Sequence, residues 1–405
     1  MEKESNRTKL IAILFLFLIY LTFISLGLPD SILGAAWPVV YIDLGVSFDS
    51  LGIVSMVIVA GTIFSSLISS RFIKRFGTGI VASVSVLATA IAMIGYSLGS
   101  SLFIIAVFAI LWGLGGGAID VAMNNFVSRY YDALHMSWLH GFWGVGAFIG
   151  PLIIGVFINN NENWRGGFFA VAMILFAISI LLFITLPVWK NKESGGDREP
   201  ESEKTEEAFR KITDLSAAKP IQIRGVRDSM VAILVYCALQ YTVGLWGSSF
   251  LVYAREFTAA QAAAGISLFF IGITAGRFLN GFLTRKFSAS QLIRLGILLI
   301  SAGTGLLFVP AGGIVPLIAL LLLGIGCAPV YPTMMHETPR RFGSKYSSNI
   351  IGYQTAAAYI GATFFPPVVG LAANNISIFA IPVFIAILAV TMLFSTERIN
   401  NVLSK

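Results

Sequence analysis

Three charged residues lie deep inside apolar stretches of the sequence. Asp30 is in the run SLGLPDSILGAAWP, Asp120 is in GLGGGAIDVAMNNF, and Arg277 is in GITAGRFLNG. A charged side chain at the centre of a bilayer costs roughly 3 kcal/mol on insertion scales. A poorly hydrated site disfavours the charged form of a carboxylate, which can then load a proton from one side and release it to the other. The two acids therefore predict proton coupling, with Arg277 as the candidate partner of Asp120.

Each of these residues also has a structural interpretation. Asp30 follows Pro29, which lacks a backbone donor and loosens a helix, so the aspartate alternatively satisfies freed backbone groups. Arg277 alternatively extends its long side chain to the nearer membrane surface. Asn124 lies one turn after Asp120 and makes sodium an alternative to the proton. Counted along the helices, Asp30 belongs to the outer half of the membrane, and Asp120 and Arg277 belong to the inner half.

Uncharged polar and aromatic residues inside the apolar runs are candidates for binding a solute. Their amides, hydroxyls and rings could orient a hydroxylated ligand or cover a sugar ring, and a histidine could relay a proton. Individually, such residues are more typical of contacts between helices or of the membrane interface. The candidates are Asn124, Asn125, Trp37, Trp112, His140, Trp143, Gln240, Trp246, Asn280, Tyr331 and Gln354.

The elements that must position these residues are membrane-spanning helices. The chain is 57% hydrophobic and 12% charged, whereas soluble domains are about 25% charged. Apolar runs long enough to cross a hydrocarbon core of about 30 Å recur from end to end. We expect an all-α polytopic membrane protein with twelve spans, near 10–41, 49–73, 78–98, 101–129, 137–158, 166–188, 228–254, 259–284, 289–309, 314–338, 347–373 and 376–395.

A charged linker divides the spans into six plus six. The linker is expected over 190–227, with a short surface helix around Glu203 to Ile212, between an N-terminal half (1–189) and a C-terminal half (228–405). Spans 2 and 8 end in the similar turns SRFIKRFG and GFLTRKFS. Two pseudo-symmetric six-helix halves are typical of transporters with a site between the halves.

The distribution of basic residues predicts the orientation. If both termini are cytoplasmic, 24 of the 27 Lys and Arg residues fall on the cytoplasmic side. Cytoplasmic loops are enriched in Lys and Arg, so we expect both termini inside, in a bacterial plasma or inner membrane. The net charge of +7 is therefore no nucleic-acid signal.

Several other functions are excluded by what the sequence lacks. It shows no phosphate-binding loop, metal-ligand spacing or nucleophile triad, and both cysteines lie in apolar runs. We expect no enzyme, no metal and no cofactor apart from the proton as coupling ion. The expected partners are a small-molecule solute and the lipid bilayer, and the chain is expected to be monomeric.

The whole chain resembles the major facilitator superfamily, through its twelve spans, its division into halves and its repeated turn. Within it, the Asp30-Ser31-Ile32 element, the span 4 sequence GLGGGAIDVAMNNF and Gly276-Arg277-Phe278-Leu279 are similar to fucose–proton symporters. That resemblance implies that Asp30 and Asp120 carry the coupling of proton and sugar transport.

The sequence also departs from the patterns of these relatives. Lys74 stands where the common signature after span 2 has an aspartate, Gln240 stands near an acid of many relatives, and Asp120 replaces a glutamate that is usual in sugar symporters. Span 5 contains GVGAFIGPLIIG, which is similar to a motif of drug antiporters. We therefore predict a proton-coupled, alternating-access transporter of a sugar or sugar-like solute. The alternatives are a proton-driven exporter of amphipathic compounds and a non-transporting sensor of the same fold.

Overall fold

The computed structural model describes residues 2–131, 133–160, 163–194, 220–343 and 346–403. Nearly all of them are helical. The helices are α1 (Glu2–Asp43), α2 (Ser50–Phe76), α3 (Thr78–Leu98), α4 (Leu102–Tyr130), α5 (Ala133–Asn159), α6 (Trp164–Ile184), α7 (Leu186–Ser194), η1 (Pro220–Gln222), α9 (Val226–Arg255), α10 (Ala259–Leu283), α11 (Ala289–Phe308), α12 (Ile314–Cys327), α13 (Val330–Phe342), α14 (Ser347–Asn375) and α15 (Ala380–Leu403).

Twelve segments of the described chain are long and apolar enough to cross a membrane, as predicted. The tenth is split into α12 and α13 at Pro329, because proline lacks the N–H that the helix would need. By contrast, α1 continues through Pro29 and Pro38, so the loosening predicted at Pro29 does not interrupt the helix. The surface helix predicted around Glu203 to Ile212 lies outside the described residues.

Two helix ends carry a basic pair followed by Phe-Gly. Helix α2 ends in Arg75-Phe76-Gly77 and α13 ends in Arg341-Phe342-Gly343. The two glycines have φ values of 84° and 87°, a region that other residues rarely adopt. Glycine therefore lets the chain leave each helix sharply, and after Gly77 the next helix, α3, begins at once.

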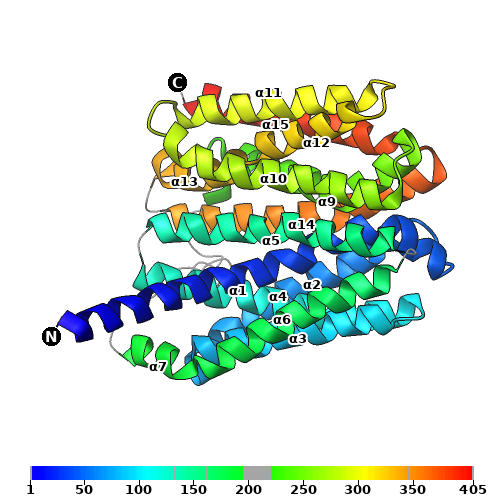
Figure 1. The fold of residues 1–405 in the computed structure, drawn as a ribbon. Helices are drawn as coiled ribbons and strands as arrows, with labels where there is room; N and C mark the ends of the chain where they lie inside the picture. Colours follow the sequence, from blue (N-terminus) through cyan, green and yellow to red (C-terminus); the bar gives the residue numbers. More distant parts are fainter. Residues whose placement is uncertain (1, 132, 161–162, 195–219, 344–345, 404–405) are drawn as a thin grey trace.

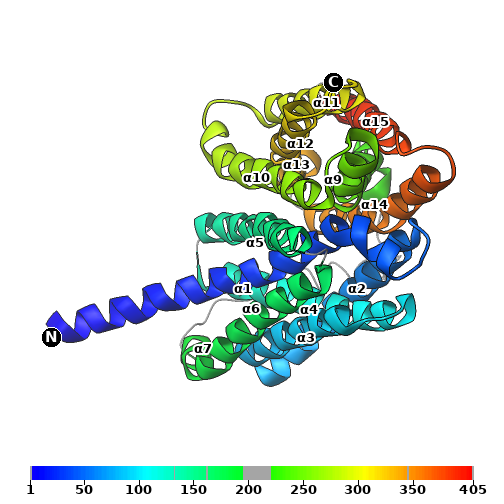
Figure 2. The same cartoon turned by 45° about the vertical axis from the view of Figure 1, so that its right-hand side comes forward.

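The helices before the linker pack together, as do those after it (Figure 1). Helices α5 and α14 lie along the boundary, where α5 packs against α10, α14 against α2, and α1 against α9. Figure 1 shows both chain ends at the same end of the bundle, and Figure 2 shows the start of α1 extending beyond the other helices there. We call this the terminal end, and we call the end that holds the α1–α2 turn the opposite end.

The outer surface of the bundle is apolar. Large side chains such as Phe103 and Phe394 are exposed by 76% and 71%, which would be costly in water and is natural against acyl chains. Inside the bundle, glycines allow helices to approach closely. A Cβ atom on Gly146 would lie 2.2 Å from the Ile24 carbonyl oxygen of α1. The chain is a multi-pass membrane protein.

Candidate functional site

Helix α1 carries Asp30 into the boundary between the halves. One turn earlier, Gly27 packs against the backbone of α5, where an added Cβ would lie 2.0 Å from the Trp143 carbonyl oxygen. One turn later, Gly34 packs against α9 of the other half in the same manner. The Asp30 side chain is nevertheless exposed, and its Oδ2 accepts a hydrogen bond of 2.8 Å from Trp143 Nε1.

Trp143 connects Asp30 to the arginine of the other half. The guanidinium carbon of Arg277 on α10 lies 5.2 Å from the centroid of the Trp143 ring. An arginine over an indole face at this distance gains cation–π stabilisation. The indole therefore donates its N–H to an acid of the N-terminal half and presents its face to the base of the C-terminal half.

The surroundings of Arg277 are polar as well as aromatic. The Tyr236 hydroxyl on α9 lies beside the guanidinium and donates a hydrogen bond of 2.5 Å to Gln240 Oε1. His140, one turn before Trp143 on α5, is close enough for electrostatic interaction with Arg277. The structure thus brings four predicted residues together: Arg277, Trp143, His140 and Gln240.

Asp120 has a neutral partner on its own helix. Asn124 Nδ2 donates to Asp120 Oδ1 at 2.8 Å and to the Asp120 carbonyl oxygen at 2.9 Å. Asp120 is also within electrostatic range of Asp30. Within the described part of the chain, no ion pair of 4.0 Å or less joins Asp120 to Arg277. Their pairing therefore stays a prediction for another conformation.

Tyrosines of the C-terminal half face the two acids. Tyr241 on α9 interacts electrostatically with both Asp30 and Asp120, and it is 46% exposed. Tyr331 and Tyr359 lie within electrostatic range of Asp120. Of these three tyrosines, only Tyr331 was predicted from the sequence. The missed signal was the presence of phenolic residues in otherwise apolar spans of one half.

Five of the candidates lie apart from this group. Trp37, Trp112, Trp246 and Gln354 are each 2% exposed or less. Trp37 and Trp246 donate their indole N–H groups to the carbonyl oxygens of residues 48 and 366, respectively. Trp112 packs edge-on against a tyrosine of α3. Gln354 forms hydrogen bonds with two side-chain hydroxyls. Asn125 is half-buried next to Asn124. Trp112, Trp246 and Gln354 thus join neighbouring helices in this conformation, and Trp37 joins α1 to the turn before α2.

Asn280 is a different case. It lies one turn after Arg277 on α10 and is 9% exposed, and its Oδ1 has no hydrogen-bond partner among the described residues. A buried amide oxygen without a partner is costly, by about 1–3 kcal/mol. Asn280 thus has an unused acceptor that is buried one turn from Arg277 in this conformation.

The two halves are tied together toward the opposite end of the bundle. Ser248 Oγ donates to the Ala35 carbonyl oxygen at 3.1 Å, and the hydroxyls of Tyr41 and Tyr253 lie 2.8 Å apart. Each bond joins α1 to α9. The structure therefore has the halves in contact beyond Asp30, on the side away from the chain ends.

The described residues contain no cluster of side chains suited to binding a metal ion. No group of three or more His, Cys, Asp or Glu side chains there could hold a metal ion. Cys237 and Cys327 are buried free thiols.

The family follows from the fold together with the sequence. Residues 19–366 match the profile of the Major Facilitator Superfamily. The chain belongs to this superfamily. It is therefore a member of a family of membrane transporters, and its two six-helix halves with charged residues between them are the expected framework for moving a solute.

Two relatives named as sugar or sugar-phosphate transport proteins align with most of the chain. The chain is 22% identical over 369 residues to the glucose/mannose transporter GlcP of Bacillus subtilis, covering 88% of this chain and 87% of that protein. It is 23% identical over 369 residues to a probable hexose phosphate transport protein of Chlamydia pneumoniae, covering 81% and 78%. The predicted resemblance to fucose–proton symporters stays a prediction.

A solved structure agrees with the architecture. A crystal structure of the nucleoside transporter NupG, determined for a point mutant, superimposes with a TM-score of 0.73 at 13% identity, covering 95% of this chain and 98% of that chain. At this identity the likeness concerns the fold alone.

Proposed function

We propose that this protein is a proton-coupled transporter of a sugar or sugar-like solute that works by alternating access of its two halves. The observation that carries the proposal is the link from Asp30 through Trp143 to Arg277, because it joins an acid of one half to the base of the other. The sugar class is supported by the relatives named for glucose, mannose and hexose phosphate transport.

The link offers a way for a proton to change the contact between the halves. The Trp143 N–H donates to the Asp30 carboxylate, and a hydrogen bond to a charged acceptor is roughly twice as strong as a neutral one. Protonation of Asp30 removes that charge. The indole is then held less firmly, and so is the face that it presents to Arg277. Proton loading would thereby alter the packing of α5 against α10.

A hydroxylated solute would find matching groups around this link. The phenols Tyr241, Tyr331 and Tyr359 can donate to ring hydroxyls and can cover an apolar sugar face. Asp120 with Asn124 offers a carboxylate and an amide on the facing helix. Both proton and solute would then act on the same group of side chains, which is the requirement for coupling.

The side of the membrane that the described conformation serves follows from the proposed orientation. With the terminal end in the cytoplasm, as the concentration of basic residues there favours, the contacts between Ala35 and Ser248 and between Tyr41 and Tyr253 close the external side. The described conformation would then be the one that exchanges solute with the cytoplasm.

Transport by purified protein in proteoliposomes tests the proposal. We expect an imposed inward proton gradient to drive uptake of a hexose such as glucose or mannose, and a sodium gradient to fail. In Asp30→Asn and Asp120→Asn, gradient-driven accumulation should fall at least about tenfold, while exchange of labelled against unlabelled sugar persists. That split is expected because a neutral amide keeps the shape of the site and loses only the titratable charge.

Asp49→Asn is the matched control, because Asp49 lies in the turn at the opposite end, where Ser47 donates to it. This variant should retain accumulation. Proton-driven accumulation that persists in both Asp30→Asn and Asp120→Asn would contradict the proposal. Proton-driven dye export without any response to sugars would favour the exporter instead.

A further inference from the structure

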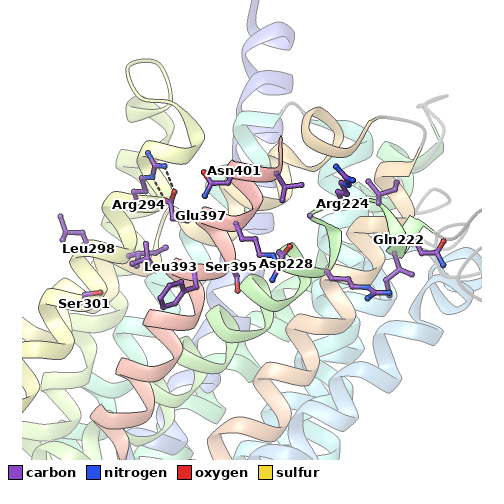
Figure 3. A pocket seen from close by; sticks show the side chains of 18 residues that line it. Gln222, Arg224, Asp228, Arg294, Leu298, Ser301, Leu393, Ser395, Glu397 and Asn401 are labelled. Carbon is purple, nitrogen blue, oxygen red and sulfur yellow. Dashed lines mark hydrogen bonds and ion pairs between the residues drawn. The ribbon is translucent and has the colours of Figure 1, made fainter. Parts of the chain in front are cut away.

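A pocket of about 1610 Å³ lies at the terminal end of the C-terminal half, away from the central site. It is enclosed by the start of α9 with the residues before it, by α11 and by α15 (Figure 3). Its lining contains four arginines and two acids: Arg224, Arg227, Arg294, Arg398, Asp228 and Glu397. No residue of the proposed transport site contributes to it.

Part of this charge is paired. Arg294 forms a two-pronged ion pair with Glu397, with Nε–Oε1 and Nη2–Oε2 distances of 2.5 and 2.6 Å (Figure 3). Arg398 Nε lies 3.4 Å from Asp228 Oδ1, and the Arg398 side chain is 74% exposed. These two pairs connect α9, α11 and α15, because each joins two of the three helices.

Two positive charges are left over. Arg224 and Arg227 are exposed, and within the part of the chain that the structure describes neither has an ion-pair partner. Both line the pocket, Arg224 from the segment that precedes α9 and Arg227 from the first turn of α9. The pocket therefore has an uncompensated positive rim, which favours an anion.

The wall below the rim is apolar and faces outward. One turn deeper than Arg294 and Arg398, Leu298 of α11 and Phe394 of α15 are exposed by 65% and 71%. Both helices are membrane spans, so these side chains lie where acyl chains run. On α11 and α15 the pocket thus passes from charged to lipid-facing side chains within one helical turn.

We propose that this pocket binds the headgroup of an anionic phospholipid. The phosphate would lie against Arg224 and Arg227, which can each donate two parallel hydrogen bonds to phosphate oxygens. One acyl chain would lie along Leu298 and Phe394. Basic pockets between helices at the membrane surface suit anionic headgroups on these grounds. A bound lipid would join the end of the linker to α11 and α15 at the point where α9 begins.

Lipid retention measured by native mass spectrometry tests this proposal independently of transport. The full chain is purified in detergent and titrated with phosphatidylglycerol or phosphatidylcholine. We expect tight retention of phosphatidylglycerol and weak retention of phosphatidylcholine. In Arg224→Gln/Arg227→Gln, affinity for phosphatidylglycerol should fall at least about tenfold. The reason is that each Lys or Arg near an anionic lipid surface adds appreciably to the attraction of the lipid.

Arg285→Gln/Lys286→Gln is the matched control, because both residues are exposed in the turn after α10 at the same end of the same half. This variant should retain wild-type affinity. Equal losses in the two double variants would overturn the proposal in favour of diffuse attraction. Equal competition by soluble sn-glycerol 3-phosphate would also overturn it, since the acyl chain would then contribute nothing. Thermal unfolding of both double variants verifies that they are folded.

Discussion

The charges of the central site are held differently from those at the ends of the bundle. At the ends, acids and bases pair within their own half, as in Asp43 with Arg165, and Glu397 with Arg294. At the centre, Asp30 and Asp120 are held by the neutral donors of Trp143 and Asn124, respectively. In an exposed ion pair each carboxylate already has a charged partner, although the pair adds little stability. A carboxylate held by a neutral N–H can gain a proton or change partner at smaller cost, which suits a site that must alternate.

The two halves also contribute unequally to the centre. The N-terminal half supplies both acids and the indole, and the C-terminal half supplies Arg277 and the phenols. Neither half holds a complete site. Function therefore depends on contact across the boundary, and the following predictions test that dependence.

The largest effect is expected from forcing the halves apart. An alanine Cβ at position 34 would lie 2.6 Å from the carbonyl oxygens of Gly244 and Leu245, and overpacking of this kind costs typically about 1–3 kcal/mol. Gly34→Ala should therefore lower sugar uptake by about tenfold or more. It should also lengthen the distance between spin labels at Ile42→Cys and Ile376→Cys near the opposite end.

Gly305→Ala is the control for that substitution. Gly305 lies in α11, and an added Cβ there has no atom within 4 Å. Uptake and label distance should match the parent protein. Unchanged uptake in Gly34→Ala would show that the contact of α1 with α9 at this glycine is unimportant for transport.

A smaller effect is expected from removing the base of the C-terminal half. Arg277→Gln should slow sugar exchange by about tenfold, because the cation–π contact and the local positive charge are both lost. In an Asp30→Asn background Arg277→Gln should slow exchange clearly less. The expected coupling free energy between the two substitutions is about 1 kcal/mol. The measurement is a double-mutant cycle on exchange rates in proteoliposomes.

The same cycle with Asp120→Asn separates two interpretations of Arg277. The structure favours coupling with Asp30 through Trp143, whereas the sequence predicted coupling with Asp120. Additivity with Asp30→Asn together with coupling to Asp120→Asn would favour the sequence-based pair. If the effect of Arg277→Gln adds to those of both Asp30→Asn and Asp120→Asn, neither link contributes to exchange.

The smallest effect is expected from removing one hydrogen bond of the link. Trp143→Phe keeps an aromatic face for Arg277 and loses the indole N–H that Asp30 accepts. Such a bond to a charged group contributes about 1.5–3 kcal/mol, part of which other donors can replace, so we expect uptake to fall about threefold to tenfold. Trp138→Phe on the same helix is the control, since Trp138 is 42% exposed on α5; equal losses in both variants would speak against a special role of Trp143.

Much of the fold and part of the site could be predicted from the sequence. Length and apolarity determine each span, because a helix must satisfy its own backbone in lipid. The high cost of intramembrane charge singles out Asp30, Asp120 and Arg277. Close-packed glycines such as Gly146 are also visible in the sequence as small residues within apolar runs.

What only the tertiary structure decided is which side chains meet. Trp143 and Trp246 have the same chemistry and similar apolar surroundings in the sequence, yet Trp143 lies between Asp30 and Arg277 while Trp246 donates to the Pro366 carbonyl oxygen and is fully buried. The difference arises from how α5 packs on α1 and α10, and α9 on α14. Hydropathy along one helix specifies its depth and its apolarity. It does not specify its rotation against a helix more than a hundred residues away, and that rotation determines the partner of each polar group.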